Sequence, residues 1–177
     1  CNHRHSVVDW LPMWSKALFR LIGILPLLTL PVTAGESFAG AQIQEVIRLR
    51  LDRGDLLLES IQAAIGKHKI EDGAVLTAAG SLQVCTYHGV KTLAEKPEQQ
   101  FTTVQGPLEI IGVNGLIAAG EPHIHMTLSR PEGGALGGHL EKGCKVLYRA
   151  ELTIAKFSGT ALARKPNQAG VPMLQKR

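Results

Sequence analysis

The pattern of apolar and polar residues predicts a strand followed by a helix at the start of the folded part of the chain. Residues 43–51 alternate between an apolar side and a side that carries Arg48 and Arg50, which is the period of a half-buried strand. Asp55 then predicts the N-cap of a helix over 56–65, which Gly66 ends. Its apolar residues fall at helical spacing and are expected to face a sheet: Leu57, Leu58, Ile61 and Ile65.

The remainder of the chain predicts strands separated by turns and loops. The expected strands cover 74–86, 101–119, 123–128, 145–155 and 161–164, with a bulge at Gly80-Ser81 and a hinge within 112–115. Turn or loop residues dominate 71–73, 91–100 and 130–138, and the tail over 166–177 is expected to be irregular. One early helix followed by many strands predicts an α/β (α+β) fold, with a mostly antiparallel central sheet flanked by one main helix.

The first 41 residues have the pattern of a targeting segment. Lys16 and Arg20 precede an uncharged, mostly apolar stretch over 21–34 and then small residues, the order found in secretory signal peptides. We therefore predict an upstream extension over 1–12, a signal peptide over 13–41, a domain over 43–165, and a periplasmic or secreted location. The apolar stretch is shorter than the roughly 20 residues of a membrane span, so no stable span is expected after cleavage. An uncleaved anchor is the alternative.

Composition and charge restrict the function classes. Apolar residues make up 45% of the chain and charged residues 19%, which is sufficient for a hydrophobic core. The formal charge is +4; three basic and two acidic residues precede Gln42, so the part from Gln42 onward carries +3. Its basic residues are scattered singly or in pairs. This is a weak electrostatic footprint for nucleic acid, so direct binding of DNA is disfavoured but stays open.

Two of the three cysteines lie within the predicted domain. Cys85 and Cys144 occupy apolar, strand-like stretches, and no Cys-x-x-Cys pair is present. We interpret both as buried free thiols. A disulfide between them in an oxidising compartment is left open, because spacing alone cannot establish one.

Three histidines form the most concentrated chemistry of the sequence. His123 and His125 are two residues apart on a predicted strand, so they should project from the same face. His139 follows a glycine-rich connection, in which Gly137 and Gly138 are expected to form a structural turn that folds it back beside them. Three neutral imidazoles suit a divalent metal, zinc above all, and leave a fourth position for water or a ligand. A hydrogen-bonded cluster that positions the hairpin is the alternative.

The same residues carry a family resemblance. The matching motifs are Arg50-Leu51, Gly54 to Ile61, Gly80-Ser81-Leu82, Gly106 to Ile111, Pro122 to His125, and Gly137 to Leu140. From about Glu45 to Arg164, the sequence resembles the plants-and-prokaryotes conserved (PPC) domain, in its stand-alone prokaryotic form. The resemblance implies an α/β fold around a mostly antiparallel sheet, assembled as a homotrimer. It also implies that His123, His125 and His139 bind a metal such as zinc near a subunit boundary.

Plant relatives of this family carry DNA-binding hooks that this sequence does not match. No Arg-Gly-Arg-Pro hook is present, and Pro107 stands where the plant version has a basic residue. Glu109 matches the family pattern, and we interpret it either as a second-shell carboxylate of the metal site or as a residue that satisfies a backbone turn.

These features predict an exported, homotrimeric metal-binding module that holds a small anionic ligand. Two alternatives are kept, namely a DNA-binding protein, as the family is usually labelled, and a metal-dependent hydrolase or lyase. For the latter, the sequence offers four candidate general bases without ranking them: Glu109, Glu121, Glu132 and Glu141. Whether the protein is an enzyme is left open.

Overall fold

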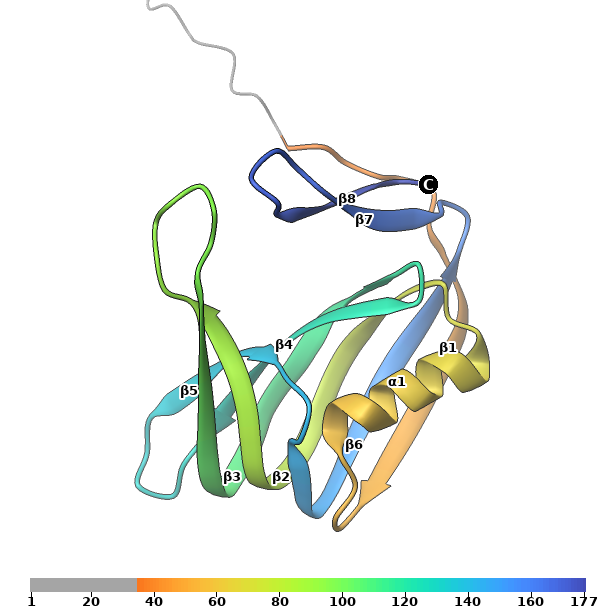
Figure 1. Ribbon diagram of the computed structural model, residues 1–177. Coiled ribbons are helices and arrows are strands. Elements are labelled where there is room, and N and C mark those ends of the chain that lie inside the picture. The colour runs from red at the N-terminus through yellow and green to blue at the C-terminus, as the bar shows by residue number, and fades with distance from the viewer. Residues whose placement is uncertain (1–34) are drawn as a thin grey trace, which may run out of the picture. The chain divides into compact units, whose positions relative to one another are not determined.

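Strands dominate the computed structural model, which describes residues 35–177 (Figure 1). This part contains one helix and eight strands, and the predicted signal peptide lies outside it except for its last residues. The elements are β1 (Gln42–Asp52), α1 (Leu57–His68), β2 (Asp72–Val90), β3 (Gln99–Ala118), β4 (Glu121–Ser129), β5 (Ala135–Leu140), β6 (Lys145–Ser158), β7 (Leu162–Pro166) and β8 (Pro172–Lys176). The mostly antiparallel sheet flanked by one helix is confirmed, although the fold is more sheet-dominated than a balanced α/β fold.

Six strands form one antiparallel sheet in the order β1-β6-β2-β3-β4-β5. The edge strand β5 also pairs with β2, because Tyr87 pairs with Leu140 and His88 with His139. Strands β2, β3, β4 and β5 therefore close into a four-stranded ring, while β1 and β6 extend the sheet beyond it. Register shifts between β2 and β6, from Val75 to Val84, bend β2 and include the predicted bulge near Gly80.

Helix α1 packs on the part of the sheet formed by β1 and β6 (Figure 1). The predicted apolar face of the helix is buried, and Leu57 and Ile61 are fully inaccessible to solvent. Burial of a large aliphatic side chain contributes about 1.5–3 kcal/mol, so this face is sufficient to hold the helix on the sheet. The predicted apolar side of β1 also enters the core through Ile47 and Leu51.

Both ends of helix α1 lie at other residues than predicted. The N-cap is Leu56 and not Asp55, because the Asp55 carboxylate accepts a hydrogen bond from the backbone N–H of Asp52 (2.8 Å). The helix continues through Gly66 and stops at Lys69, which adopts the left-handed conformation. Strand β2 begins at Asp72, so the turn predicted over 71–73 is largely part of a strand.

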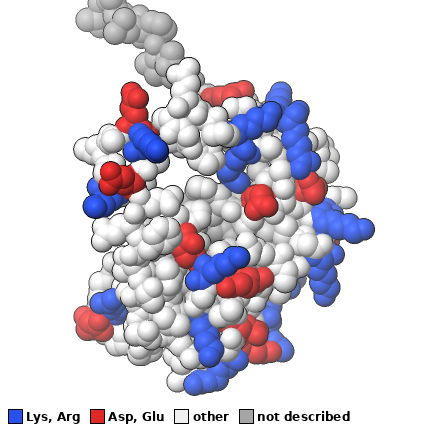
Figure 2. Space-filling model, viewed as in Figure 1, with Lys and Arg blue, Asp and Glu red and all other residues white. Residues whose placement is uncertain are grey.

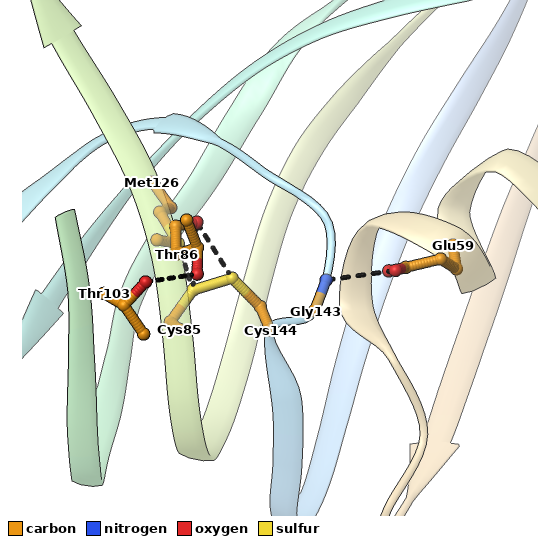
Figure 3. The surroundings of a disulfide bond; sticks show 7 residues. All are labelled: Glu59, Cys85, Thr86, Thr103, Met126, Gly143 and Cys144. Carbon is orange, nitrogen blue, oxygen red and sulfur yellow. Dashed lines mark hydrogen bonds between the residues drawn. A yellow bond between two sulfur atoms is a disulfide. The ribbon is translucent and has the colours of Figure 1, made fainter. Parts of the chain in front are cut away.

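Cys85 and Cys144 form a disulfide between β2 and the residue that precedes β6 (Figure 3). Both side chains are fully buried. The interpretation as free thiols is therefore wrong, because strand pairing brings together two residues that are 59 apart in sequence. Next to the bond, the backbone N–H of Gly143 donates to the Glu59 carboxylate (3.0 Å), which connects this turn to α1.

The C-terminal residues form a hairpin and not an irregular tail. Strands β7 and β8 pair from Leu162 with Lys176 to Pro166 with Pro172. The Asn167 side chain accepts hydrogen bonds from the backbone N–H groups of Ala169 and Val171, which fixes the turn. The hairpin is attached where β2 begins, because Arg177 bonds Glu71 and the Leu162 N–H donates to Asp72.

No helix within residues 35–177 has the length and apolar character needed to cross a membrane.

Candidate metal centre

Strand β4 presents its two histidines on its outward face. Buried residues alternate with exposed ones along this strand, so Ile124, Met126 and Leu128 enter the core while His123 and His125 point outward. The two imidazoles stack with ring centroids 5.3 Å apart, and their Nε2 atoms are 3.3 Å apart. The predicted common face of this histidine pair is therefore present.

The third histidine reaches the pair through strand register. His139 on β5 pairs directly with His125 on β4, and directly paired residues share a face of the sheet. Its ring centroid lies 4.8 Å from that of His123 and 5.4 Å from that of His125. One ligand nitrogen from each of the three rings can be chosen so that all lie within 4.8 Å of one another. The sequence-predicted trio is therefore brought together.

Gly137 and Gly138 lie in a strand and not in the predicted turn. Both lie within β5, so the turn expected at these residues is wrong; the chain turns earlier, near Gly133 and Gly134. A Cβ atom on Gly137 would collide with the Met126 carbonyl oxygen, and one on Gly138 with that of His88. Glycine is therefore required because the neighbouring strands β4 and β2 approach β5 closely on both sides.

The surroundings favour the neutral form of two of the imidazoles, those of His139 and His123. Burial, followed by the charges of His123, His88 and His125, lowers the pKa of His139 to about 4, against a smaller opposite effect of Glu141. Burial also lowers the pKa of His123, with further contributions from Arg164, His125 and His88. A neutral imidazole has a free lone pair for a metal, so the rings of His139 and His123 need not lose a proton near pH 7 to act as ligands.

A fourth histidine, His88, lies beside the trio, although its polar neighbours in sequence predict a surface residue. Its side chain is only 13% exposed, and its ring stacks on that of His139 with centroids 4.5 Å apart. His88 Nδ1 lies 2.6 Å from a carboxylate oxygen of Glu141. The predicted strand stops at Thr86, whereas β2 continues to Val90, and this extension brings His88 to the site.

Glu109 does not lie beside the histidines. It pairs with Ser129 at the far end of β4, four residues beyond His125, which corresponds to about 13 Å along a strand. Register therefore places the Glu109 carboxylate at the other end of the strand pair from the histidines of the same chain. Glu141 is the carboxylate next to the cluster, and His88, His139 and Glu141 form a second group whose donor atoms could share a cation.

The donor set fits a zinc ion. Two ligands at the Zn–N distance of about 2.0–2.1 Å in tetrahedral geometry are about 3.3 Å apart, which matches the Nε2 atoms of His123 and His125. The His139 nitrogen lies within 4.8 Å of the other two, so reaching the same spacing requires a shift of at most about 1.5 Å. Three imidazoles would leave a fourth tetrahedral position free for water or another ligand.

Arg164 reaches this region from the C-terminal hairpin. Its guanidinium group donates to the carbonyl oxygen of Leu116 and to that of Glu121, both at 3.1 Å. Leu116 is the strand partner of His123, and Glu121 lies two residues before His123 on β4. Burial lowers the pKa of Arg164, which nevertheless stays protonated. No sequence motif pointed to this residue.

A family model, the Plants and Prokaryotes Conserved (PCC) domain, matches residues 39–158, which cover β1 to β6 and all four histidines of the site. The chain belongs to this family. The PCC match ends before β7, so the C-terminal hairpin and Arg164 lie outside the matched residues.

Solved structures share this PCC fold. One is a plant- and prokaryote-conserved protein from Pyrococcus horikoshii, with 25% identity, a TM-score of 0.68, and coverage of 80% of this chain and 99% of that one. A second, described as a metal-containing protein from Archaeoglobus fulgidus, has 22% identity, a TM-score of 0.69, and coverage of 80% and 100%. A third, described as a putative DNA-binding protein from Bacteroides thetaiotaomicron, has 17% identity, a TM-score of 0.67, and coverage of 78% and 96%.

A curated relative is much longer than this chain. The bifunctional protein GlmU of Synechococcus sp. (strain JA-3-3Ab) is 29% identical over 124 residues, which cover 70% of this chain. The match spans only 19% of that relative.

Proposed function

We propose that this PCC protein is an exported, homotrimeric module that binds one divalent metal ion per chain, zinc above all, through His123, His125 and His139. The open coordination position holds a small anionic ligand, because three neutral imidazoles leave the charge of the ion uncompensated. The convergence of three imidazole nitrogens within 4.8 Å is the observation that carries this proposal.

The side chains that contact the histidines also support metal binding. Metal-bound histidines are usually oriented by neighbouring side chains, and their loss commonly weakens metal binding by about 10–100-fold. Here the ring of His88 stacks on His139 and is itself held by Glu141 (2.6 Å). The His139 ring is thereby supported on the side away from β4.

The disulfide supports export. Disulfides persist in oxidising compartments and are rare where cellular thiols stay reduced. The Cys85–Cys144 bond agrees with the targeting pattern of residues 13–41, which lies almost wholly outside the described residues. Mass spectrometry of the protein isolated from its source, with and without reduction, tests both the bond and the cleavage of the signal.

Exposed apolar residues support self-association. Phe101, Ile111 and Leu116 on β3 are 59%, 62% and 46% exposed, so this strand presents apolar side chains that a second chain could cover. Association of three chains would remove part of this surface from water. Light scattering coupled to size exclusion gives the mass in solution and tests the trimer directly.

Metal analysis with histidine variants tests the metal site. Elemental analysis after purification in metal-free buffers and zinc reconstitution should give about one zinc per chain. His139→Ala should lose this zinc and weaken affinity by more than about 100-fold, because it removes a ligand and not only a supporting residue. His68→Ala is the matched control, since His68 lies at the end of α1 and outside the cluster. Zinc content that is well below one per chain and unchanged by His139→Ala would refute the proposal.

A metal-dependent hydrolase or lyase is the second candidate function, and the His88–Glu141 pair favours it. Of the four carboxylates that the sequence offers as a base, Glu141 is the one hydrogen-bonded to a histidine next to the trio. A metal-bound water in such a site can become a nucleophile near neutral pH. A panel of ester, phosphoester and lactone substrates should show turnover that requires both zinc and Glu141; absence of turnover with the zinc-loaded protein would dismiss this candidate.

DNA binding is the remaining alternative, because a similar structure is described as a putative DNA-binding protein. On the face shown in Figure 2, basic side chains gather mainly at the upper right, and acidic side chains next to and below them limit the extent of this basic surface. Gel-shift assays at increasing salt concentration decide the matter. Strong binding that falls steeply with salt would revive the DNA-binding function.

A further inference from the structure

We propose that Arg164 is a ligand-selecting residue that binds the anion held at the open position of the histidine metal site, so that the site takes small oxyanions, either carboxylates or phosphates. This inference rests on the proposed metal site. It assigns a role to the C-terminal hairpin, which lies outside the residues matched by the family model.

The position of the guanidinium carries the argument. Its two hydrogen bonds join the backbone of β3 at Leu116 with that of β4 at Glu121. His123 is the strand partner of Leu116 and lies two residues after Glu121 on β4. Paired residues share a face of the sheet, so the Leu116 and His123 side chains emerge together. Arg164 is therefore fixed at the edge of the histidine cluster by the fold itself.

Arg164 retains donor capacity for a ligand. A guanidinium group has five N–H donors, and the two carbonyl bonds use two of them. The remaining three make no hydrogen bond to any residue within 35–177. Arginine pairs with carboxylates and phosphates through two parallel N–H donors, which defines the chemical class of the ligand.

The balance of charge favours an anion over an empty coordination position. A divalent ion held by three neutral imidazoles, next to a guanidinium, concentrates positive charge in one place. Glu141 is the nearby carboxylate, and it is already engaged by His88. Without an anion, Arg164 repels the metal, whereas a bound oxyanion interacts favourably with both. The two ligands should therefore bind cooperatively.

Cobalt-loaded protein provides the test. Co²⁺ replaces Zn²⁺ in three-histidine sites and reports a change of ligand through its visible absorption. The Co²⁺-loaded protein is titrated with inorganic phosphate and, separately, with acetate, at constant ionic strength. At least one of them should change the spectrum of the unmodified protein in a saturable way, and the preferred anion distinguishes phosphate from carboxylate selectivity.

Variants separate ligand binding from folding of the hairpin. Arg164→Gln should weaken anion binding by about tenfold or more, because it removes charge-assisted hydrogen bonds. Co²⁺ affinity without the anion should be unchanged or higher, because a repulsive charge is lost. Arg164→Lys keeps the charge and should recover part of the anion affinity. Arg177→Gln is the matched control, since it breaks the hairpin contact with Glu71 and should leave anion binding unchanged.

These experiments distinguish a failure of the proposed role of Arg164 from a failure of the proposed metal site. Absence of Co²⁺ binding, or binding that survives His139→Ala, would refute the proposed metal site itself. Normal Co²⁺ binding with the same anion affinity in Arg164→Gln as in the unmodified protein would overturn the role of Arg164 alone. Equal loss of metal and anion binding in Arg164→Gln and Arg177→Gln would also overturn it, because both effects would then come from displacement of the hairpin.

Discussion

The two parts of the sheet are stabilised in different ways. Strands β1 and β6 are covered by α1, whose buried face includes Leu57 and Ile61. Strands β3, β4 and β5 and the second half of β2 instead close into a ring, and Leu58 of α1 lies beside it. Its buried apolar residues, such as Ile124 and Leu128, belong to the same hydrophobic core as Leu57 and Ile61.

This difference explains why the histidines lie on the ring. A strand of the ring buries its inward residues and exposes its outward ones, so the outward face of β4 and β5 is free for polar chemistry. In the helix-covered part, the side chains between helix and sheet contribute packing. We infer that stability and metal binding are largely separable in this protein, and substitutions in the two parts should show it.

The largest effect on stability is expected from the disulfide, which joins the two parts. Cys85→Ala with Cys144→Ala should lower the free energy of unfolding by about 4 kcal/mol, from the loop-closure entropy of a loop of about 60 residues. Zinc affinity should also fall, because Cys85 lies three residues before His88 on β2. Urea denaturation and zinc titration measure the two effects. Unchanged zinc affinity would show that strand pairing alone holds the ring around the site.

A smaller loss is expected from the helix-covered part. Ile61→Ala should lower the free energy of unfolding by about 3 kcal/mol, because it leaves a cavity at a fully buried position between helix and sheet. Zinc stoichiometry should stay at that of the unmodified protein under conditions where the variant is folded. Lys67→Ala, at an exposed position of the same helix, is the control and should change neither quantity. A loss of zinc in folded Ile61→Ala would contradict the separation of the two parts.

The smallest effect is the pH dependence of the metal-free protein. The pKa of His139 is about 4 in the folded state and about 6.5 in an unfolded chain, so the unfolded chain binds more protons between these values. Stability should therefore be fully present above pH 6.5 and decline as the pH falls toward 4. Denaturation in the presence of a chelator at pH 7 and pH 5 measures the decline, which should be smaller in His139→Asn. An equal decline in both proteins would assign it to other groups.

The sequence alone determined much of the fold and the core of the candidate site. Alternation along β4 placed His123 and His125 on one face, because side chains of a strand alternate between its two sides. Helical spacing identified the buried face of α1 for a similar local reason. The glycine-rich connection before His139 and the family resemblance both pointed to the third histidine, and the match to the PCC model confirmed the family.

The tertiary structure decided the features that depend on strand register and on closure of the ring. The return of β5 to β2 brought His88 and Glu141 to the site, and the pairing of β3 with β4 removed Glu109 from it. The disulfide and the docking of Arg164 also join residues far apart in the chain. Local patterns fix the face on which a side chain lies, because they follow from backbone geometry. They do not fix its neighbours on other strands, since these depend on how the whole sheet pairs and bends.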